Sequence, residues 1–458
     1  MKKRLAAIFG TVLLLFSFSG CSFSIMDTEA LMQPPSPTGD KQMIQQLIRE
    51  EAGAELKLCY PKNGSYRSAI LMDEDLTGDG RPDVIGFYRT PDESGGTTII
   101  FLTEENNREW SVVAKYAYSY SQIDRVCFGD LNNDGKLEAV VGWGSPVNQT
   151  GNVSVYVWHE NKMCDIRLGR TYSELVVEDL DGDGGDELFL AEVSKTESID
   201  EETTKETPAK ASLYRVKDDG IRNIATVDVD ASVTRYAQVT VGQVAKGQLA
   251  VVMDGVKADN SMISELVYWQ KTDGIGRLVV QPKNKDANSV NVSQRSAAAA
   301  ITSRDINKDG YLEIPTVELM PGIEDDKGNI SNYIVHWNRF DPEEGTLLRA
   351  ASTVVSLDYG YCFVLPESWD GAVTCDVQES SISFFEWDKT ATALTRKGEF
   401  LLKIRVFTEE EWMRFSGVDQ YAQLEKQNGY LYTVKLPETE NPLRMDLTEV
   451  ENSFSLLS

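Results

Sequence analysis

Four segments of the chain share one nine-residue pattern, D-x-[DNT]-x-D-G-x-x-[DE], and this repeat restricts the fold more than any other feature. The four copies begin at Asp75, Asp130, Asp179 and Asp305. Each copy follows an apolar run and precedes another one, which favours a loop between two β-strands. Spaced copies of one short unit are typical of chains that stack the same structural element several times. The sequence therefore predicts a repeat architecture built mainly from β-strands.

The spacing of oxygen-bearing residues in the repeat suits a calcium ion, which takes about six to eight oxygen ligands. Side chains at positions 1, 3 and 5, a backbone carbonyl at position 7 and a carboxylate at position 9 can converge on one point. Glycine at position 6 permits the sharp reversal that this convergence needs. We expect about four calcium ions. The predicted ligands are Asp75, Thr77, Asp79, Arg81 and Asp83; Asp130, Asn132, Asp134, Lys136 and Glu138; Asp179, Asp181, Asp183, Gly185 and Glu187; and Asp305, Asn307, Asp309, Tyr311 and Glu313.

An EF-hand loop is the main alternative, because it begins with the same spacing of acids. That loop needs an acid at position 12 and a helix on each side. Position 12 is Gly86, Val141, Leu190 or Thr316, and the flanking segments are rich in β-branched and aromatic residues. The pattern therefore favours loops between strands.

These segments resemble the FG-GAP/VCBS repeat, which forms the blades of integrin-type β-propellers. The resemblance implies that each Asp-rich loop joins the first two strands of a four-stranded blade. It also implies that the loops bind calcium mainly for structural reasons. A further copy at residues 243–252 keeps the apolar frame and lacks the acids, and the aromatic segment 266–269 follows it. We expect a propeller of about five blades between residues 66 and 350. A propeller of six blades is the alternative.

The N-terminal residues resemble the signal peptide of a bacterial lipoprotein. Three basic residues at positions 2–4 precede an apolar stretch, and small residues then lead to Cys21. The resemblance implies cleavage after residue 20 and a lipid on Cys21, which would anchor the chain to a cell membrane and outside the cytoplasm. An ordinary secretory signal or an uncleaved anchor are the alternatives. Residues 21–40, with three prolines, are expected to form an extended tether.

The formal net charge of −27 argues against nucleic acid as a partner, because phosphates would be repelled. The same charge suits a chain that concentrates divalent cations, although a solvated acidic surface explains it equally well. We expect the chain to contact the membrane through its lipid anchor. The protein or glycan ligand is not identified by the sequence.

The sequence predicts two folded parts, a propeller with an N-terminal helix over residues 41–350 and a small α+β domain over 356–458. In the second part we expect a capping box at Thr408 and a second helix that runs to Gln427. Residues 55–59 can add a closing strand to the last blade. The polar insertion 195–210 is expected to be a mobile loop.

Cys362 and Cys375 flank an expected hairpin, which would allow a cross-strand disulfide. The sequence does not decide whether this disulfide forms.

Enzyme chemistry finds little support in the chain. Only two histidines occur, His159 and His336, each beside a tryptophan of an expected strand. No G-x-S-x-G, H-E-x-x-H or phosphate-loop motif is present. The leading hypothesis is a non-enzymatic envelope protein that binds a protein or a glycan, or acts as a scaffold. The alternative is a calcium-dependent extracellular hydrolase or lyase that acts on glycan or peptide.

Overall fold

The computed structural model describes residues 39–53, 55–91, 95–105, 109–145, 150–198, 204–217, 220–281, 293–296, 300–323, 329–390 and 397–457. The expected signal peptide, Cys21 and nearly all of the tether lie outside these residues. The chain divides into two compact units, Met1–Leu56 and Lys57–Ser458. In the first unit, helix α3 (Asp40–Ala52) begins after Gly39 and buries Ile44 and Ile48. Within the described residues, no helix is both long and apolar enough to cross a membrane.

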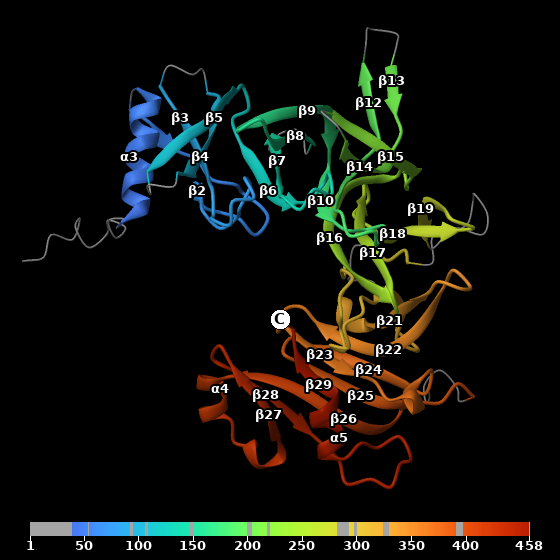
Figure 1. Ribbon diagram of the computed structural model, residues 1–458. Helices are drawn as coiled ribbons and strands as arrows, with labels where there is room; N and C mark the ends of the chain where they lie inside the picture. Colours follow the sequence, from blue (N-terminus) through green and yellow to red (C-terminus); the bar gives the residue numbers. More distant parts are fainter. Residues whose placement is uncertain are drawn as a thin grey trace, which may run out of the picture. The chain divides into compact units, whose positions relative to one another are not determined.

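The second unit is mainly β and consists of antiparallel sheets (Figure 1). In the first four sheets the strands pair largely in chain order, as in an up-and-down blade. The first sheet contains β1 (Lys57–Leu58), β2 (Ile70–Leu71), β3 (Val84–Arg89), β4 (Thr97–Glu104) and β5 (Trp110–Tyr118). The second contains β6 (Ile123–Gly129), β7 (Glu138–Ser145), β8 (Thr150–His159) and β9 (Lys162–Tyr172). The third contains β10 (Glu174–Glu178), β11 (Glu187–Glu192), β14 (Lys210–Lys217) and β15 (Gly220–Asp228). The fourth contains β16 (Val233–Ala245), β17 (Gln248–Lys257), β18 (Met262–Thr272) and β19 (Ile275–Gln281).

Two five-stranded sheets complete the second unit. The fifth sheet contains β20 (Ile314–Leu319), β21 (Tyr333–Asp341), β22 (Thr346–Ser356), β23 (Tyr361–Val364) and β29 (Phe454–Leu456). The sixth contains β24 (Val373–Gln378), β25 (Ser381–Trp387), β26 (Lys397–Thr408), β28 (Tyr430–Lys435) and β27 (Ala422–Gln427). The fifth sheet continues through the expected domain boundary at 350–356. Two short helices occur in this part of the chain: α4 (Glu409–Arg414) follows β26, and α5 (Leu447–Ser453) lies between β28 and β29.

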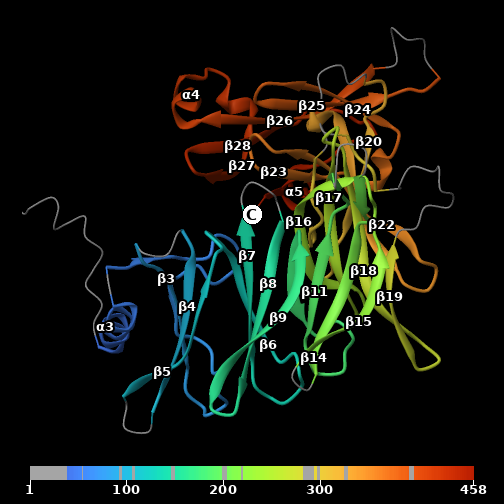
Figure 2. The ribbon, with the colours of Figure 1, turned by 90° about the horizontal axis from the view of Figure 1, so that it is seen from above.

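Consecutive sheets share their hydrophobic cores because successive residues of a strand point to opposite faces. In β7, Ala139 and Val141 pack in a cluster with the first sheet, whereas Val140 packs in a cluster with the third. In β17, Val251 packs with the third sheet and Val252 with the fifth. The middle sheets are therefore buried on both faces and stand side by side (Figure 2). A further cluster joins the fifth sheet to the sixth.

The degenerate copy at residues 243–252 forms a four-stranded sheet as expected. Its first two strands, β16 and β17, meet in a tight turn at Lys246 and Gly247. Gly247 has a φ of +72°, which suits glycine in a short hairpin. The nine-residue loop is thus replaced by a turn, and the sheet itself is retained.

Three expectations about local structure are wrong. The expected second helix ending at Gln427 is the strand β27, because Asn428 and Gly429 form a two-residue turn to β28 with positive φ angles. The strand at residues 57–58 pairs with β3 of the first sheet, not with the last blade. The polar insertion contains a hairpin of β12 (Lys195–Ser198) and β13 (Thr204–Thr207).

The two cysteines of the expected hairpin are free and buried. Cys362 lies on β23 and Cys375 on β24, and these strands belong to different sheets. The hairpin between them is therefore absent, and the cross-strand geometry that suggested a disulfide does not occur.

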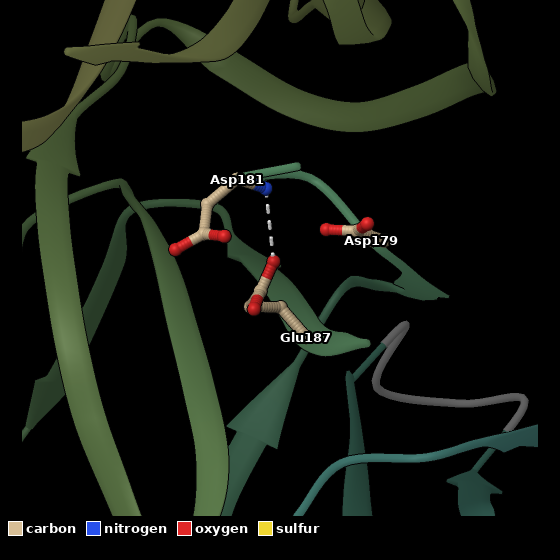
Figure 3. Close-up of side chains that lie close together, drawn as sticks. All are labelled: Asp179, Asp181 and Glu187. Carbon is tan, nitrogen blue, oxygen red and sulfur yellow. Dashed lines mark hydrogen bonds between the residues drawn. The ribbon is translucent and has the colours of Figure 1, made fainter. Parts of the chain in front are cut away.

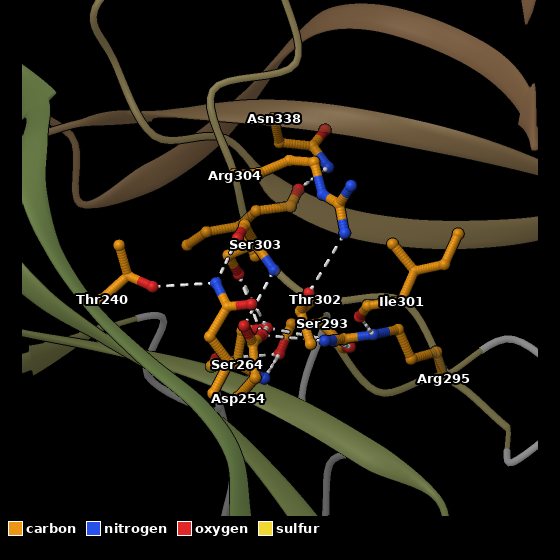
Figure 4. Close-up of polar contacts among 12 residues, drawn as sticks. Thr240, Asp254, Ser264, Ser293, Arg295, Ile301, Thr302, Ser303, Arg304 and Asn338 are labelled. Carbon is orange, nitrogen blue, oxygen red and sulfur yellow. Dashed lines mark hydrogen bonds and ion pairs between the residues drawn. The ribbon is translucent and has the colours of Figure 1, made fainter. Parts of the chain in front are cut away.

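A fully buried ion pair fixes the connection between the fourth and fifth sheets (Figure 4). Asp254 of β17 accepts a hydrogen bond of 2.9 Å from Arg295 Nη2. Its second oxygen accepts one of 2.8 Å from the backbone N–H of Ser303. The Arg295 guanidinium also donates to Ser264 Oγ and to the carbonyl of Ile301. Every charge in the pair is thus compensated, as burial of ions requires.

Replacing Arg295 by methionine is expected to lower the free energy of unfolding by about 3–5 kcal/mol, because Asp254 stays buried without its partner. Urea denaturation monitored by tryptophan fluorescence measures the change. Arg277→Met, at an exposed position of β19, is the control and should change it by less than about 0.5 kcal/mol. The double variant Asp254→Asn/Arg295→Met should regain part of the loss. Equal losses for Arg277→Met and Arg295→Met would contradict the role of the pair.

Candidate metal centre

The four Asp-rich loops occupy corresponding places in their sheets. The second and third loops join the first two strands of their sheets, β6 to β7 and β10 to β11. The first loop joins β2 to β3, which are the second and third strands of the first sheet. The fourth precedes β20, and there Arg304 and Glu313 form an isolated bridge in place of a first strand. The expectation that the loops connect the first two strands is confirmed for the second and third copies, whereas in the first sheet the additional strand β1 precedes β2.

The first aspartate of each loop organises the loop backbone. In the second loop, Asp130 Oδ1 accepts from the N–H of Asp134 at 3.0 Å, and Oδ2 accepts from Gly135 at 2.8 Å. The first aspartates of the other three loops accept from the glycine at position 6 in the same way. Gly135 has a φ of +83°, and the other three glycines at position 6 also have positive φ angles. Glycine is therefore required here by the backbone.

The ninth residue is an acid that is buried at the base of each loop. Glu138 is 1% exposed, and its carboxylate accepts from the Leu131 N–H at 2.7 Å and from Asn132 Nδ2 at 2.9 Å. The ninth acids of the other loops accept likewise from the N–H of position 2. Burial raises the pKa of Glu138 to about 8, and the nearby Asp134 and Asp130 add to this effect.

In each sheet, the strand that follows the loop pairs with the next strand of the sheet. The residue of that next strand that lies opposite the buried acid differs between the sheets. In the third sheet Leu188 pairs with Tyr214, so Glu187 faces Arg215 one residue further along. In the fifth sheet Ile314 pairs with Asn338, so Glu313 faces Arg339. The corresponding residues in the first and second sheets are Thr103 and Val157. Two of the buried ninth acids thus face a guanidinium of the paired strand, and two do not.

Arg215 contacts three acids of the third loop. It forms ion pairs with Glu187, with Asp183 at 2.8 Å and with Asp181 at 3.2 Å. The hydrogen bond from Arg215 lowers the pKa of Asp183. Burial raises the pKa of Glu187 to about 7, although Arg215 opposes this shift. Arg339 pairs with Asp309 and lies 3.5 Å from Glu313 Oε1.

The third loop also brings three carboxylates together (Figure 3). Oxygens of Asp179, Asp181 and Glu187 lie within 4.8 Å of one another, and the Asp181 N–H donates to Glu187 at 3.1 Å. Among the described residues this is the group of acids with the spacing of a metal site. In the other loops position 3 is threonine or asparagine, which supplies a neutral oxygen.

The fifth and seventh residues are linked within each loop. The backbone N–H of Arg81, Lys136, Gly185 or Tyr311 donates to the aspartate two residues earlier. In the first loop the Arg81 side chain folds back on Asp79, and this hydrogen bond lowers the pKa of Asp79. The seventh residues differ in their side-chain contacts, since Arg81 pairs with Asp79 whereas the Tyr311 ring lies under the Arg339 guanidinium.

The second loop suits a cation best. Its buried Glu138 faces Val157, and no cationic side chain forms an ion pair with its acids within the described part of the chain. Asn132 Oδ1 is buried and has no hydrogen-bond partner there. A buried carboxylate and an unsatisfied amide oxygen both gain free energy from a bound cation. The third and fifth sheets supply a guanidinium instead, which the repeat pattern did not reveal.

Comparison with known proteins supports the repeat. A family model described as "FG-GAP-like repeat" matches residues 75–141, which include the first two loops. No curated protein matches the sequence. Among solved structures, a protein from Lactobacillus plantarum aligns at 11% identity and a TM-score of 0.25, over 74% of this chain and 93% of its own. The six-bladed β-propeller lectin of Aleuria aurantia aligns at 10% identity and a TM-score of 0.23, over 70% and 95%. Both scores lie below 0.5, so neither alignment defines how the sheets are arranged.

Replacing Asp130 by alanine is expected to destabilise the metal-free protein by about 1–2 kcal/mol, because two backbone N–H groups lose their acceptor. Asp130→Asn keeps one acceptor oxygen and should cost roughly half as much. Urea denaturation in the presence of a chelator measures both values. If Asp130→Ala leaves the midpoint unchanged without metal, the aspartate acts through a bound ion and not through the backbone.

Proposed function

We propose that the chain is a non-enzymatic binding or scaffold protein whose sheets form a calcium-stabilised β-propeller of about five blades. The observation that carries this proposal is the recurrence of one loop at one place in consecutive, face-packed sheets. The match to the FG-GAP-like repeat over residues 75–141 supports it. Repeated blades usually bury the loops' acids for structural reasons and leave one face for a ligand.

Calcium is proposed to bind the loops through the ligands that the sequence predicts. When bound, the ion supplies positive charge to acids that otherwise repel one another. With Kd values of about 10⁻⁴–10⁻³ M and about 1 mM calcium, each site contributes roughly 0.4–1.4 kcal/mol. The second loop is proposed to depend most on the ion because Glu138 has no cationic partner. Arg215 and Arg339 compete with the ion in the third and fifth sheets.

The resemblance of the N-terminal residues and Cys21 to a lipoprotein signal supports the proposal of a location outside the cytoplasm, with a lipid anchor in the cell membrane. Residues 21–40 would then separate the folded part from the lipid surface. The net charge of −27 disfavours nucleic acid and anionic lipid as ligands of the folded part. The partner is accordingly proposed to be a glycan or a protein.

Calcium at 1 mM is expected to raise the melting temperature of chelator-treated protein by a few degrees, because several sites contribute. Asp134→Ala should remove part of this increase. Arg215→Met should enlarge it, because the third loop loses its competing guanidinium. Lys246→Met, at the turn that replaces a loop, is the control and should leave the increase unchanged. An unchanged melting temperature, with well under one calcium per chain by elemental analysis, would contradict the metal assignment.

One observation favours hydrolysis as a second candidate function. His336 Nδ1 lies 2.8 Å from Ser352 Oγ, and Nε2 lies 3.3 Å from Glu318 Oε2. His336 and Ser352 line a pocket of about 610 Å³ beside β21 and β22. Burial lowers the pKa of His336, which keeps the imidazole neutral and able to accept a proton. A serine, a neutral histidine and a carboxylate in contact are the parts of a nucleophilic site.

A fluorophosphonate probe separates the two functions, because it labels serines that a neighbouring base activates. The binding function predicts no labelling of the intact protein at a probe concentration that labels a known serine hydrolase. The hydrolase predicts labelling at Ser352, identified by mass spectrometry, with loss in His336→Gln. Ser331→Ala, a buried serine outside this contact, is the control and should not affect labelling.

A further inference from the structure

A second pocket lies at the opposite ends of the strands that carry the loops. It has a volume of about 480 Å³ and is formed where β6, β10 and β16 begin, whereas the second and third loops follow the ends of β6 and β10. Its lining residues are Lys62, Asn63, Gln122, Asp124, Arg125, Gly144, Gly151, Tyr172, Ser173, Glu174, Thr234, Arg235 and Tyr236. The set contains no aliphatic side chain. The charged and hydrogen-bonding groups among these side chains suit a ligand with polar substituents.

The floor of the pocket is a fixed hydrogen-bond network. Asp124 accepts from Asn63 Nδ2 and from the Tyr172 hydroxyl, both at 2.7 Å. Arg125 joins Asp124 to Glu174, with both distances at 2.9 Å. These side chains come from β6, β9, β10 and the segment before β2, and they hold one another in place, so the site exists before a ligand binds.

Close packing around Tyr172 depends on glycine. A Cβ atom at Gly151 would lie 2.4 Å from the Tyr172 ring, and one at Gly144 would lie 3.1 Å from the Asp124 Cβ. Only hydrogen at these two positions leaves the ring and the carboxylate where they are. The sequence thus preserves the position of both polar groups.

The groups that remain unpaired are mainly hydrogen-bond donors. Lys62 and Arg235 form no ion pair within the described residues, and the Tyr236 hydroxyl is buried there without a hydrogen-bond partner. With Arg125, the lining carries three cations against the two carboxylates of Asp124 and Glu174, a net charge of +1. The whole chain has a net charge of −27. A positive pocket in so acidic a protein favours a small anionic ligand.

We propose that this pocket binds a hexuronic acid, either free or as the end residue of an acidic polysaccharide. Lys62 and Arg235 would receive the carboxylate as charge-assisted donors. The remaining acceptor sites of Asp124 and Glu174, together with Tyr236, would receive the ring hydroxyls. A volume of this size accommodates one or two sugar rings. The proposal rests on the proposed binding function and names its ligand class.

Isothermal titration of the full chain with 1 mM calcium tests the assignment. Glucuronate is expected to bind at least 10-fold more tightly than glucose, which lacks the carboxylate, and than propionate, which lacks the hydroxyls. Lys62→Met/Arg235→Met should weaken glucuronate binding at least 10-fold, and Tyr236→Phe should weaken it about 3-fold. Lys246→Met, an exposed cation at the far end of β16, should leave it unchanged. Both cations are exposed, so the double variant should keep its melting temperature.

A trimeric uronide in a parallel titration separates the two sources of the ligand. Tighter binding of the trimer than of the monomer assigns a polysaccharide end, and equal binding assigns the free acid. Equal affinity for glucuronate and glucose, or full binding by the double variant, overturns the pocket assignment. If the protein still retains another glycan or a protein partner, the binding function stands without this pocket. If it retains no ligand from a glycan array or an envelope pulldown, the binding function itself fails.

Discussion

The fold depends on the burial of both faces of its middle sheets. Val140 and Val141 are adjacent in β7, yet they pack in two different cores with two different neighbours. No such sheet can satisfy its apolar residues alone, so each requires the next one. This constraint explains why the fourth sheet persists although its loop has become a two-residue turn at Lys246 and Gly247. Stacking preserves the strands, and the loops are free to vary in length and in their acids.

The buried ninth acid is the second constraint, because each sheet must compensate a carboxylate inside its base. The solutions differ between sheets. Arg215 and Arg339 bring a guanidinium from the paired strand, whereas Val157 brings none to Glu138. The same backbone geometry thus has a cation of the protein beside the buried acid in one sheet and an apolar side chain there in another. A shared loop pattern therefore does not imply that all four loops have the same affinity for metal.

The sequence was sufficient to predict the strands around the first three loops, the hidden fourth sheet and the glycine at position 6. These features follow from local periodicity and backbone conformation. It did not predict Arg215, Arg339 or the Asp254–Arg295 pair, because these contacts join residues that are 26 to 41 positions apart in the chain and depend on how strands and loops come together. The turn at Asn428 and Gly429 is different. Its dipeptide is a strong hairpin signal, and weighing it against the helical pattern would have identified β27.

Strand β6 has a consequence of its own. Its seven residues, Ile123–Gly129, carry the start of the polar pocket at one end and lead directly into the second loop at the other. This strand pairs with β7 along its length. The same strand pairing therefore positions Asp124 and Arg125 of the pocket and the residue from which the second loop starts.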